Sequence, residues 1–192
     1  MLPSHDEAYR AAAARLSPAA LAHSERVAET AAVIAAAYGM DADAARVAGL
    51  LHDWHRETPG EELLARAREL GIPVTDVDES VTYLLHGPVA AHDLAEVFPG
   101  IAEEITAAVG AHTYGAASMT PLAKIVYIAD VLEPGRRHVQ AQALRGQVGV
   151  MSLDQLFAAT YAASVRHLVD TGRRIHPQTV AVWNRHVAGE RP

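Results

Sequence analysis

The chain has 192 residues, which is enough for one domain with a sizeable core, and its formal net charge of −7 argues against broad binding to nucleic acids or membrane surfaces. Half of the residues are hydrophobic but only 5% are aromatic, and alanine is abundant, which favours closely packed helices over sheets. There is no cysteine, so disulfides and thiolate metal sites are excluded, and any metal must be bound by nitrogen and oxygen atoms.

The sequence shows neither a secretion signal nor a membrane span. Asp6 and Glu7 stand where a secretory signal would need an apolar segment. The longest uncharged run, residues 105–123, contains Gly110 and Pro121, which fit a broken helix and a loop. We therefore expect a cytoplasmic protein.

Helix start and stop signals punctuate most of the chain. Ser17 before Pro18 is typical of an N-cap followed by a first-turn proline, and Thr120 before Pro121 repeats the pattern. Asp41 can cap a further helix. The expected helices cover residues 7–15, 17–38, 41–54, 61–70, about 78–86, 88–99, 101–112, 120–132, 152–171 and 177 onward. We find no convincing strand, so the predicted fold class is all-α, in a single domain over 1–192 with residues 1–17 as an N-terminal helical extension.

An adjacent His-Asp pair, His52-Asp53, follows the apolar helical run of residues 48–51. Imidazole nitrogen and carboxylate oxygen are both good ligands for a divalent metal. Neighbouring residues on a helix point about 100° apart, so both can reach one target only at a helix end.

Six residues at helix ends or on inward stripes form the candidate site. They are His23, His52, Asp53, His86, His112 and Asp130. A single inward histidine is most often a hydrogen-bonded core residue. Four histidines and two aspartates are hard to bury as unpaired polar groups, whereas a pair of metal ions would satisfy them together.

The order of these residues resembles the HD-domain metal phosphohydrolases, and within them the YqeK-type symmetrical bis(5'-nucleosyl)-tetraphosphatases. The residues that carry the resemblance are Ala22-His23-Ser24 with Arg26-Val27-Ala28, Ala48 to Asp53, His86-Gly87-Pro88-Val89, His112-Thr113, Lys124 to Asp130, Glu133 to Arg136, Ile175-His176-Pro177, Thr179-Val180 and Asn184. The His-Asp pair alone is a weak motif, whereas the ordered set spans nearly the whole chain.

The resemblance implies an HD-domain helical bundle with two metal ions, most often iron, although manganese, cobalt or zinc would suit the same ligands. It implies that His23, His52, Asp53 and Asp130 hold one ion, that His86 and His112 hold the other, and that Asp53 bridges them. Two ions ~3.5–4 Å apart can share a hydroxide and clamp a phosphate oxygen during attack on phosphorus.

The activity implied by the resemblance is hydrolysis of diadenosine tetraphosphate into two ADP. The alternatives are an HD-type nucleotidase acting on mononucleotides or deoxynucleotides, and a non-catalytic HD module that binds nucleotides. A cyclic-dinucleotide phosphodiesterase is disfavoured because its His-His pair and Gly-Tyr-Pro signature are missing. The expected partner is a nucleotide substrate, with neither nucleic acid nor membrane, in a protein that could form a homodimer.

Basic residues near the candidate site should handle the phosphate charge of the substrate. We assign catalytic roles to Asp53, Arg56 and Lys124, and substrate binding to Arg56, Thr113, Arg136, Arg137 and His176. For each arginine the competing interpretation is a solvated surface charge, and His176 could instead be an N-cap. We interpret Arg173-Arg174 as a helix C-terminal charge.

Two positions depart from the family pattern. His55 precedes the basic Arg56, and Tyr114 follows Thr113 where relatives commonly have a second threonine. Both should lie at the rim of the pocket and bear on substrate preference.

Overall fold

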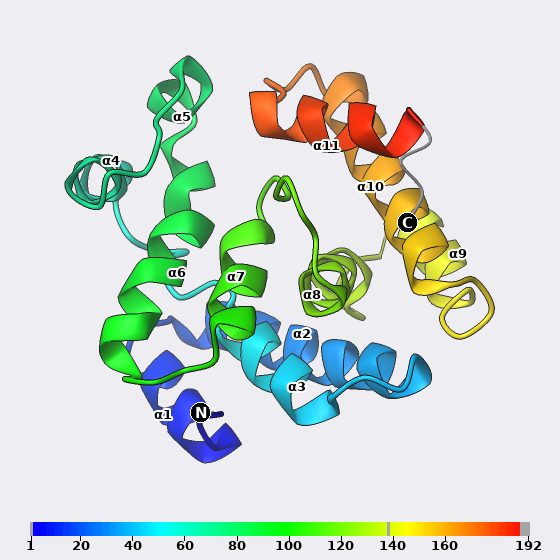
Figure 1. The fold of residues 1–192 in the computed structure, drawn as a ribbon, viewed down its shortest axis with the longest axis horizontal. Coiled ribbons are helices and arrows are strands. Elements are labelled where there is room, and N and C mark those ends of the chain that lie inside the picture. The colour runs from blue at the N-terminus through cyan, green and yellow to red at the C-terminus, as the bar shows by residue number, and fades with distance from the viewer. Residues whose placement is uncertain (1, 138, 189–192) are drawn as a thin grey trace.

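The computed structural model describes residues 2–137 and 139–188, and α-helices account for nearly all of its regular structure (Figure 1). Over these residues there are eleven α-helices, one 3₁₀ helix (η1) and no strand. Their bounds are α1 His5–Ala13, α2 Pro18–Ala37, α3 Ala42–Leu51, α4 Gly60–Glu69, α5 Asp76–Ser80, η1 Thr82–Leu85, α6 His86–Val97, α7 Glu103–Ala111, α8 Pro121–Leu132, α9 Val139–Arg145, α10 Leu153–Asp170 and α11 Pro177–Val187. The all-α prediction is confirmed.

Polar caps begin the long helices where the sequence predicts them. The side chain of Ser17 accepts a hydrogen bond from the Ala20 amide at the start of α2, and Thr120 caps α8 in the same way. Asp41 accepts from two amides of α3. Each cap satisfies amide groups that the first turn of a helix leaves without an internal partner.

The core lies where α2, α3 and α8 pack together, with α7 and α10 against them. Leu50 and Leu51 of α3 and Ile125 and Ile128 of α8 are fully buried. The N-terminal α1 adds the buried Ala8 and other small side chains to the same cluster. This core fixes the ends of α3, α7 and α8, on or beside which four of the six candidate ligands lie.

Three details differ from the sequence-based expectation. The segment before His86 is broken into α5 and η1, and α6 begins at His86 itself. Pro88 still lies within the first turn, where its missing amide proton costs no helical hydrogen bond. The short α9 was not predicted. α1 begins at His5, two residues before the expected start.

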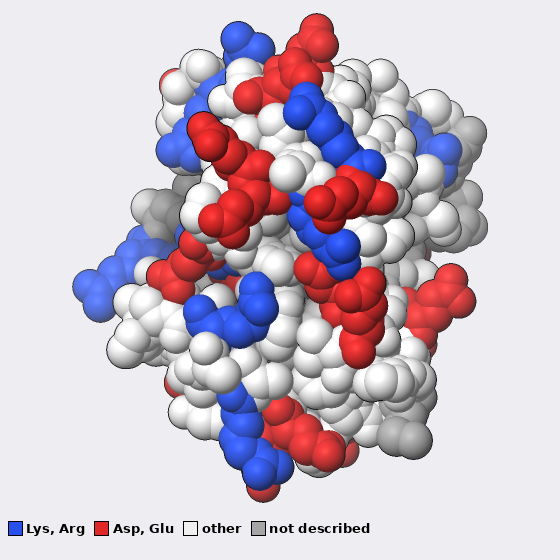
Figure 2. Space-filling model, turned by 90° about the vertical axis from the view of Figure 1, so that its left-hand side faces the viewer, with Lys and Arg blue, Asp and Glu red and all other residues white. Residues whose placement is uncertain are grey.

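Charged side chains of both signs alternate on the face formed by α4 and α6 (Figure 2). Arg66 of α4 donates to Asp93 of α6 at 2.7 Å, and Arg68 donates to Glu79 at 2.9 Å. The charges on this face therefore neutralise one another locally. None of the helices in the described part of the chain combines the length and apolar character needed to cross a bilayer.

Candidate metal centre

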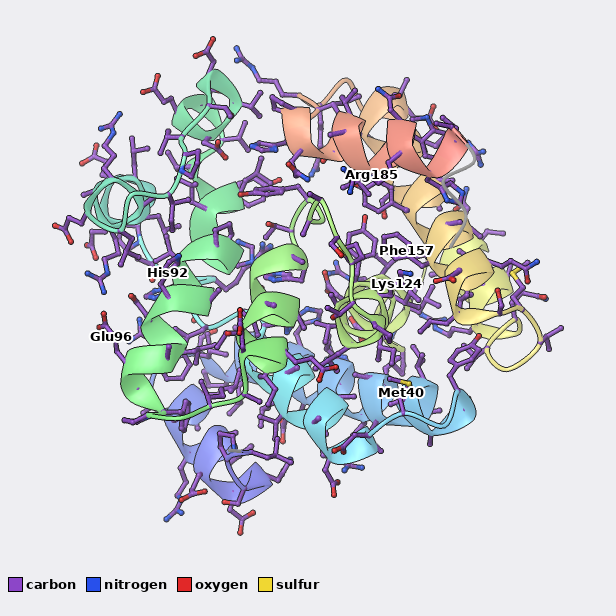
Figure 3. All side chains as sticks on the ribbon, in the orientation of Figure 1. Met40, His92, Glu96, Lys124, Phe157 and Arg185 are labelled. Carbon is purple, nitrogen blue, oxygen red and sulfur yellow. The ribbon has the colours of Figure 1, made fainter. Side chains whose placement is uncertain are left out.

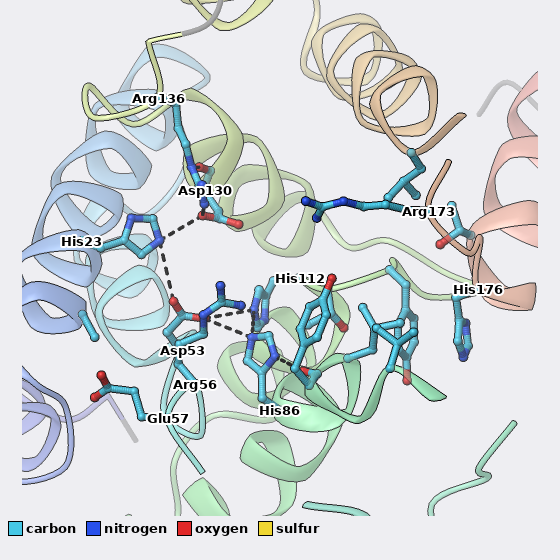
Figure 4. A pocket seen from close by; sticks show the side chains of 18 of the residues that line it. His23, Asp53, Arg56, Glu57, His86, His112, Asp130, Arg136, Arg173 and His176 are labelled. Atoms are coloured by element: carbon cyan, nitrogen blue, oxygen red, sulfur yellow. Dashed lines mark hydrogen bonds and ion pairs between the residues drawn. The ribbon is translucent and has the colours of Figure 1, made fainter. Parts of the chain in front are cut away.

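The six candidate ligands meet at one place, and five of them, all except the fully buried His52, line a cavity (Figure 4). They come from five different helices or helix ends, which is why no short motif contains them. They are His23 on α2, His52 and Asp53 at the end of α3, His86 at the start of α6, His112 at the end of α7 and Asp130 on α8.

Three of the histidines are held in one tautomer by backbone carbonyl groups. The Nδ1 atoms of His52, His86 and His112 lie 2.7, 2.5 and 2.6 Å from the carbonyl oxygens of the residues three positions earlier. A carbonyl oxygen only accepts, so each Nδ1 carries the proton. Each Nε2 atom therefore presents a lone pair to the cluster, as in a histidine that binds metal.

The Nε2 atoms have no adequate partner among the protein groups. The buried Nε2 of His52 makes no hydrogen bond to any described residue. The Nε2 atoms of His86 and His112 lie 2.9 Å apart, so that two lone pairs face each other. A buried acceptor without a donor is costly, and a cation among these atoms removes the cost. The residues present therefore fit a metal ion.

Asp53 divides its two carboxylate oxygens between two groups of imidazoles. Its Oδ1 lies 3.0 Å from His86 Nε2 and 3.7 Å from His112 Nε2. Its Oδ2 lies 3.4 Å from His52 Nε2 and 3.7 Å from His23 Nε2. A carboxylate placed in this way can contact two neighbouring cations, one through each oxygen.

His23 and Asp130 complete the side of the cluster near Oδ2. His23 Nε2 lies 3.1 Å from Asp130 Oδ1, and His23 Nδ1 lies 3.3 Å from Glu133 Oε1. Glu133 is buried and accepts a 2.7 Å hydrogen bond from Arg26 Nε. Glu133 thus orients the His23 ring in the way that outer carboxylates orient metal-binding histidines. Glu133 lies three residues after Asp130, directly after the end of α8, and no local sequence signal indicates its role.

Burial and mutual contact set the charge state of the cluster. Burial lowers the pKa of His52 to about 4 and also lowers the pKa of His86. Burial acts to raise the pKa of Asp53, but the facing histidines outweigh it and hold that pKa well below its usual range. Near neutral pH, His52 and His86 are therefore neutral and Asp53 is ionised, which is the state that metal binding requires.

The cavity above the cluster has a volume of about 1000 Å³ and basic walls. Four arginines line it, namely Arg56, Arg136, Arg173 and Arg174. The last two follow the C-terminal end of α10 at Asp170, as expected for helix C-terminal charges, and they also line the cavity. In a chain of net charge −7, this concentration of guanidinium groups favours an anionic ligand.

The structure separates the expected basic and substrate-contacting residues into two sets. Arg56, Thr113, Arg136 and His176 line the cavity. Lys124 lies on the side of α8 that faces α10 (Figure 3), where its Nζ donates to Asp154 Oδ1 at 2.5 Å. Arg137 is exposed and is also outside the cavity lining. Lys124 and Arg137 are therefore not part of the proposed site.

The two departures from the family pattern have different surroundings. His55 is buried outside the cavity, with its Nε2 2.8 Å from Asp93 Oδ2. Tyr114 lies on the cavity wall, stacked on His176 with ring centroids 4.0 Å apart. His176 also caps α11, because its Nδ1 accepts from the Gln178 amide at 3.0 Å. Only Tyr114 is therefore placed to influence a ligand directly.

Comparison with known proteins agrees with this site. The family model described as "HD domain" matches residues 20–135, which is more than half of the chain and includes all six candidate ligands. The chain belongs to the HD domain family.

Individual relatives narrow this class. A Staphylococcus aureus protein named "Bis(5'-nucleosyl)-tetraphosphatase, symmetrical" is 30% identical, and the match covers 93% of this chain and 92% of the relative. A Halalkalibacterium halodurans protein of the same name is 28% identical over 85% of this chain and 86% of its own. A crystal structure from Clostridium acetobutylicum, described as a predicted HD superfamily hydrolase involved in NAD metabolism, superposes with a TM-score of 0.88 at 29% identity, covering 98% of this chain and 99% of that one. The predicted resemblance is confirmed.

Proposed function

We propose that this protein is a metal-dependent hydrolase that cleaves diadenosine tetraphosphate symmetrically into two ADP. The observation that carries the proposal is Asp53, which divides its oxygens between two imidazole groups at the floor of a cavity with four arginines on its walls. The names of the relatives support the choice of substrate. The chemistry that a bound metal supplies is activation of a water molecule and neutralisation of phosphate charge.

The side chains of the cavity wall can bind and orient the substrate. The guanidinium of Arg136 is held by Asp130, with Nη2 2.8 Å from the carboxylate and Nε 3.1 Å from the backbone carbonyl. It is therefore fixed beside the ligand cluster, where it can neutralise a phosphate oxygen. Arg56 packs over the ring of Tyr83 at 5.7 Å and reaches the same cavity from the other side.

The far end of the cavity suits a nucleoside. His176 and Arg173 lie there, away from His23 (Figure 4), and Tyr114 stacks on His176. Aromatic and guanidinium faces stack well on nucleobases. A nucleoside at that end would direct its phosphates toward Asp53.

We further propose that the cluster holds two metal ions, and that these are iron, the metal most often found in the family. His23, His52, Asp53 and Asp130 would bind the first, and His86, His112 and the second oxygen of Asp53 would bind the other. This division follows the distances around the two oxygens of Asp53. The cytoplasmic location, the homodimer and the single-domain boundaries stay predictions.

Elemental analysis of protein purified without air should give about two metal ions per chain for the wild type. The double substitution of His86 and His112 by alanine should reduce this to about one, because only the ligands around Oδ2 of Asp53 remain. His92→Ala, on the same helix as His86 but outside the cavity, is the matched control and should keep the wild-type content. A wild type that binds one ion, unchanged in the double variant, would overturn the second site.

The products formed first from diadenosine tetraphosphate decide the cleavage pattern. We expect only ADP at early times, because attack falls on a phosphorus beside the central bridging oxygen. In water labelled with heavy oxygen, one of the two ADP molecules should carry one label. Chromatography that shows ATP and AMP as the first products contradicts symmetric cleavage. Turnover of mononucleotides without turnover of the dinucleotide would favour the nucleotidase alternative.

A further inference from the structure

A second cavity, of about 420 Å³, adjoins the metal-binding cluster on the opposite side of Arg136 from the first. It lies between the end of α8, the start of α9 and the last turns of α10. Asp130 and Arg136 border both cavities, so the two spaces meet at the ligand cluster. The polar residues that also line it are Gln140, Ser164, Arg166, His167 and Asp170.

We propose that this second cavity binds the other half of the substrate, the nucleoside diphosphate that leaves on the side away from Tyr114. The inference rests on the proposed function, because only a substrate with two nucleoside ends needs two such cavities. A volume of about 420 Å³ lies within the range of cavities that bind small molecules. It is smaller than the first cavity, which is also lined by the metal-binding residues.

The charges around the second cavity suit the phosphates of the leaving half. Arg166 is exposed at its edge on α10 and forms no ion pair with the residues that the structure describes. Arg136 stands at the junction, half exposed, with one face on Asp130. The two guanidinium groups would therefore contact successive phosphates of a polyphosphate chain that extends from the cluster into this cavity.

The other polar groups that line the cavity suit the nucleoside. Gln140 offers an amide that can both donate and accept, as the edge of a base requires. His167 offers a ring on which a base can stack. Asp170 at the end of α10 can accept from ribose hydroxyls.

The other exit from the cluster is less suited to phosphate. On that side the first cavity is bordered by Ser17, Ala20 and Glu57. Glu57 is exposed, and hydrogen bonds from Ser17 lower its pKa, so it is ionised near neutral pH. A carboxylate there repels a polyphosphate, which leaves the arginine side as the favoured path.

Calorimetric titration of the metal-loaded full-length protein with ADP tests the second cavity without any turnover. We expect two ADP per chain, one bound more tightly than the other. Arg166→Ala should weaken the weaker site by roughly tenfold, as expected for a charged hydrogen bond, and leave the affinity of the tighter one unchanged. Arg166→Lys should restore part of the loss. Arg10→Ala, an exposed arginine on α1 outside both cavities, is the charge-matched control and should bind as the wild type does.

Kinetics separate a failure of this inference from a failure of the proposed function. For diadenosine tetraphosphate, Arg166→Ala should lower kcat/KM by roughly tenfold through a higher KM. Symmetric cleavage with a single ADP site and an unchanged KM in Arg166→Ala would overturn the second cavity alone. Absence of dinucleotide hydrolysis in the wild type would overturn the proposed function itself, and the second cavity with it.

Discussion

Asp53→Ala should lower kcat/KM for diadenosine tetraphosphate by about 10³-fold or more, and should remove both metal ions. Asp53 places one carboxylate oxygen beside each group of imidazoles, Oδ1 beside His86 and Oδ2 beside His52. Its loss therefore affects both proposed ions at once, whereas the loss of any one histidine affects one. Metal-derived stabilisation of the transition state amounts to several kcal/mol, which corresponds to the expected factor.

The fold should survive this substitution, because Asp53 lies in the turn after α3 and not within the apolar core. Far-UV circular dichroism should remain helical, and elemental analysis of protein purified without air should show less than half an ion per chain. Asp154→Ala removes an equal charge from α10, outside both cavities, and is the control for activity and metal content. If Asp53→Ala keeps its metal and near-normal turnover, the assignment of the centre is wrong.

Most of the helices could be predicted from the sequence because capping residues and prolines mark where they begin. Caps such as Ser17 and Thr120 combine with the following proline to define a helix start from neighbouring residues alone. The short α9 lacks comparable signals, so its seven residues were not recognised. The break between α5 and η1 likewise contains no glycine or proline that would mark it, and η1 packs against α4.

The site shows the same division between local and distant information. His52 and Asp53 are neighbours in sequence, and both reach the cluster because α3 ends at Leu51 and the chain turns there. Glu133 is different, because its role depends on the approach of His23 from α2, 110 positions away in the sequence. Arg173 lines the cavity because the chain turns toward it after α10 ends at Asp170, and this turn depends on how α10 packs against the rest of the fold. Contacts of this kind need the tertiary structure.

The second large effect is expected at Gly49, where the helices that carry His23 and His52 pack most closely. A Cβ atom at Gly49 would lie 2.9 Å from Ala28 Cα and 3.1 Å from Ala28 N, both of them backbone atoms of α2. Neither atom can move without displacing α2 from α3 across the core. Gly49→Val adds two further methyl groups and regains little helix propensity, so overpacking should cost about 3 kcal/mol or more.

Thermal unfolding should therefore show a melting temperature roughly 6–12 °C below that of the wild type, since 1 kcal/mol corresponds to about 2–4 °C in a chain of this size. Gly146→Val is the matched control, because the nearest atom to its new Cβ is the Ala143 carbonyl oxygen at 3.5 Å, an ordinary contact. Gly49 also accepts the hydrogen bond from His52 Nδ1 at 2.7 Å, so a shift of α3 would turn that ring away from the cluster. The folded fraction of Gly49→Val should then bind less metal than the wild type at the same temperature. Equal melting temperatures for the two variants would show that α2 and α3 can separate at little cost, and that the position of His52 does not depend on their close contact.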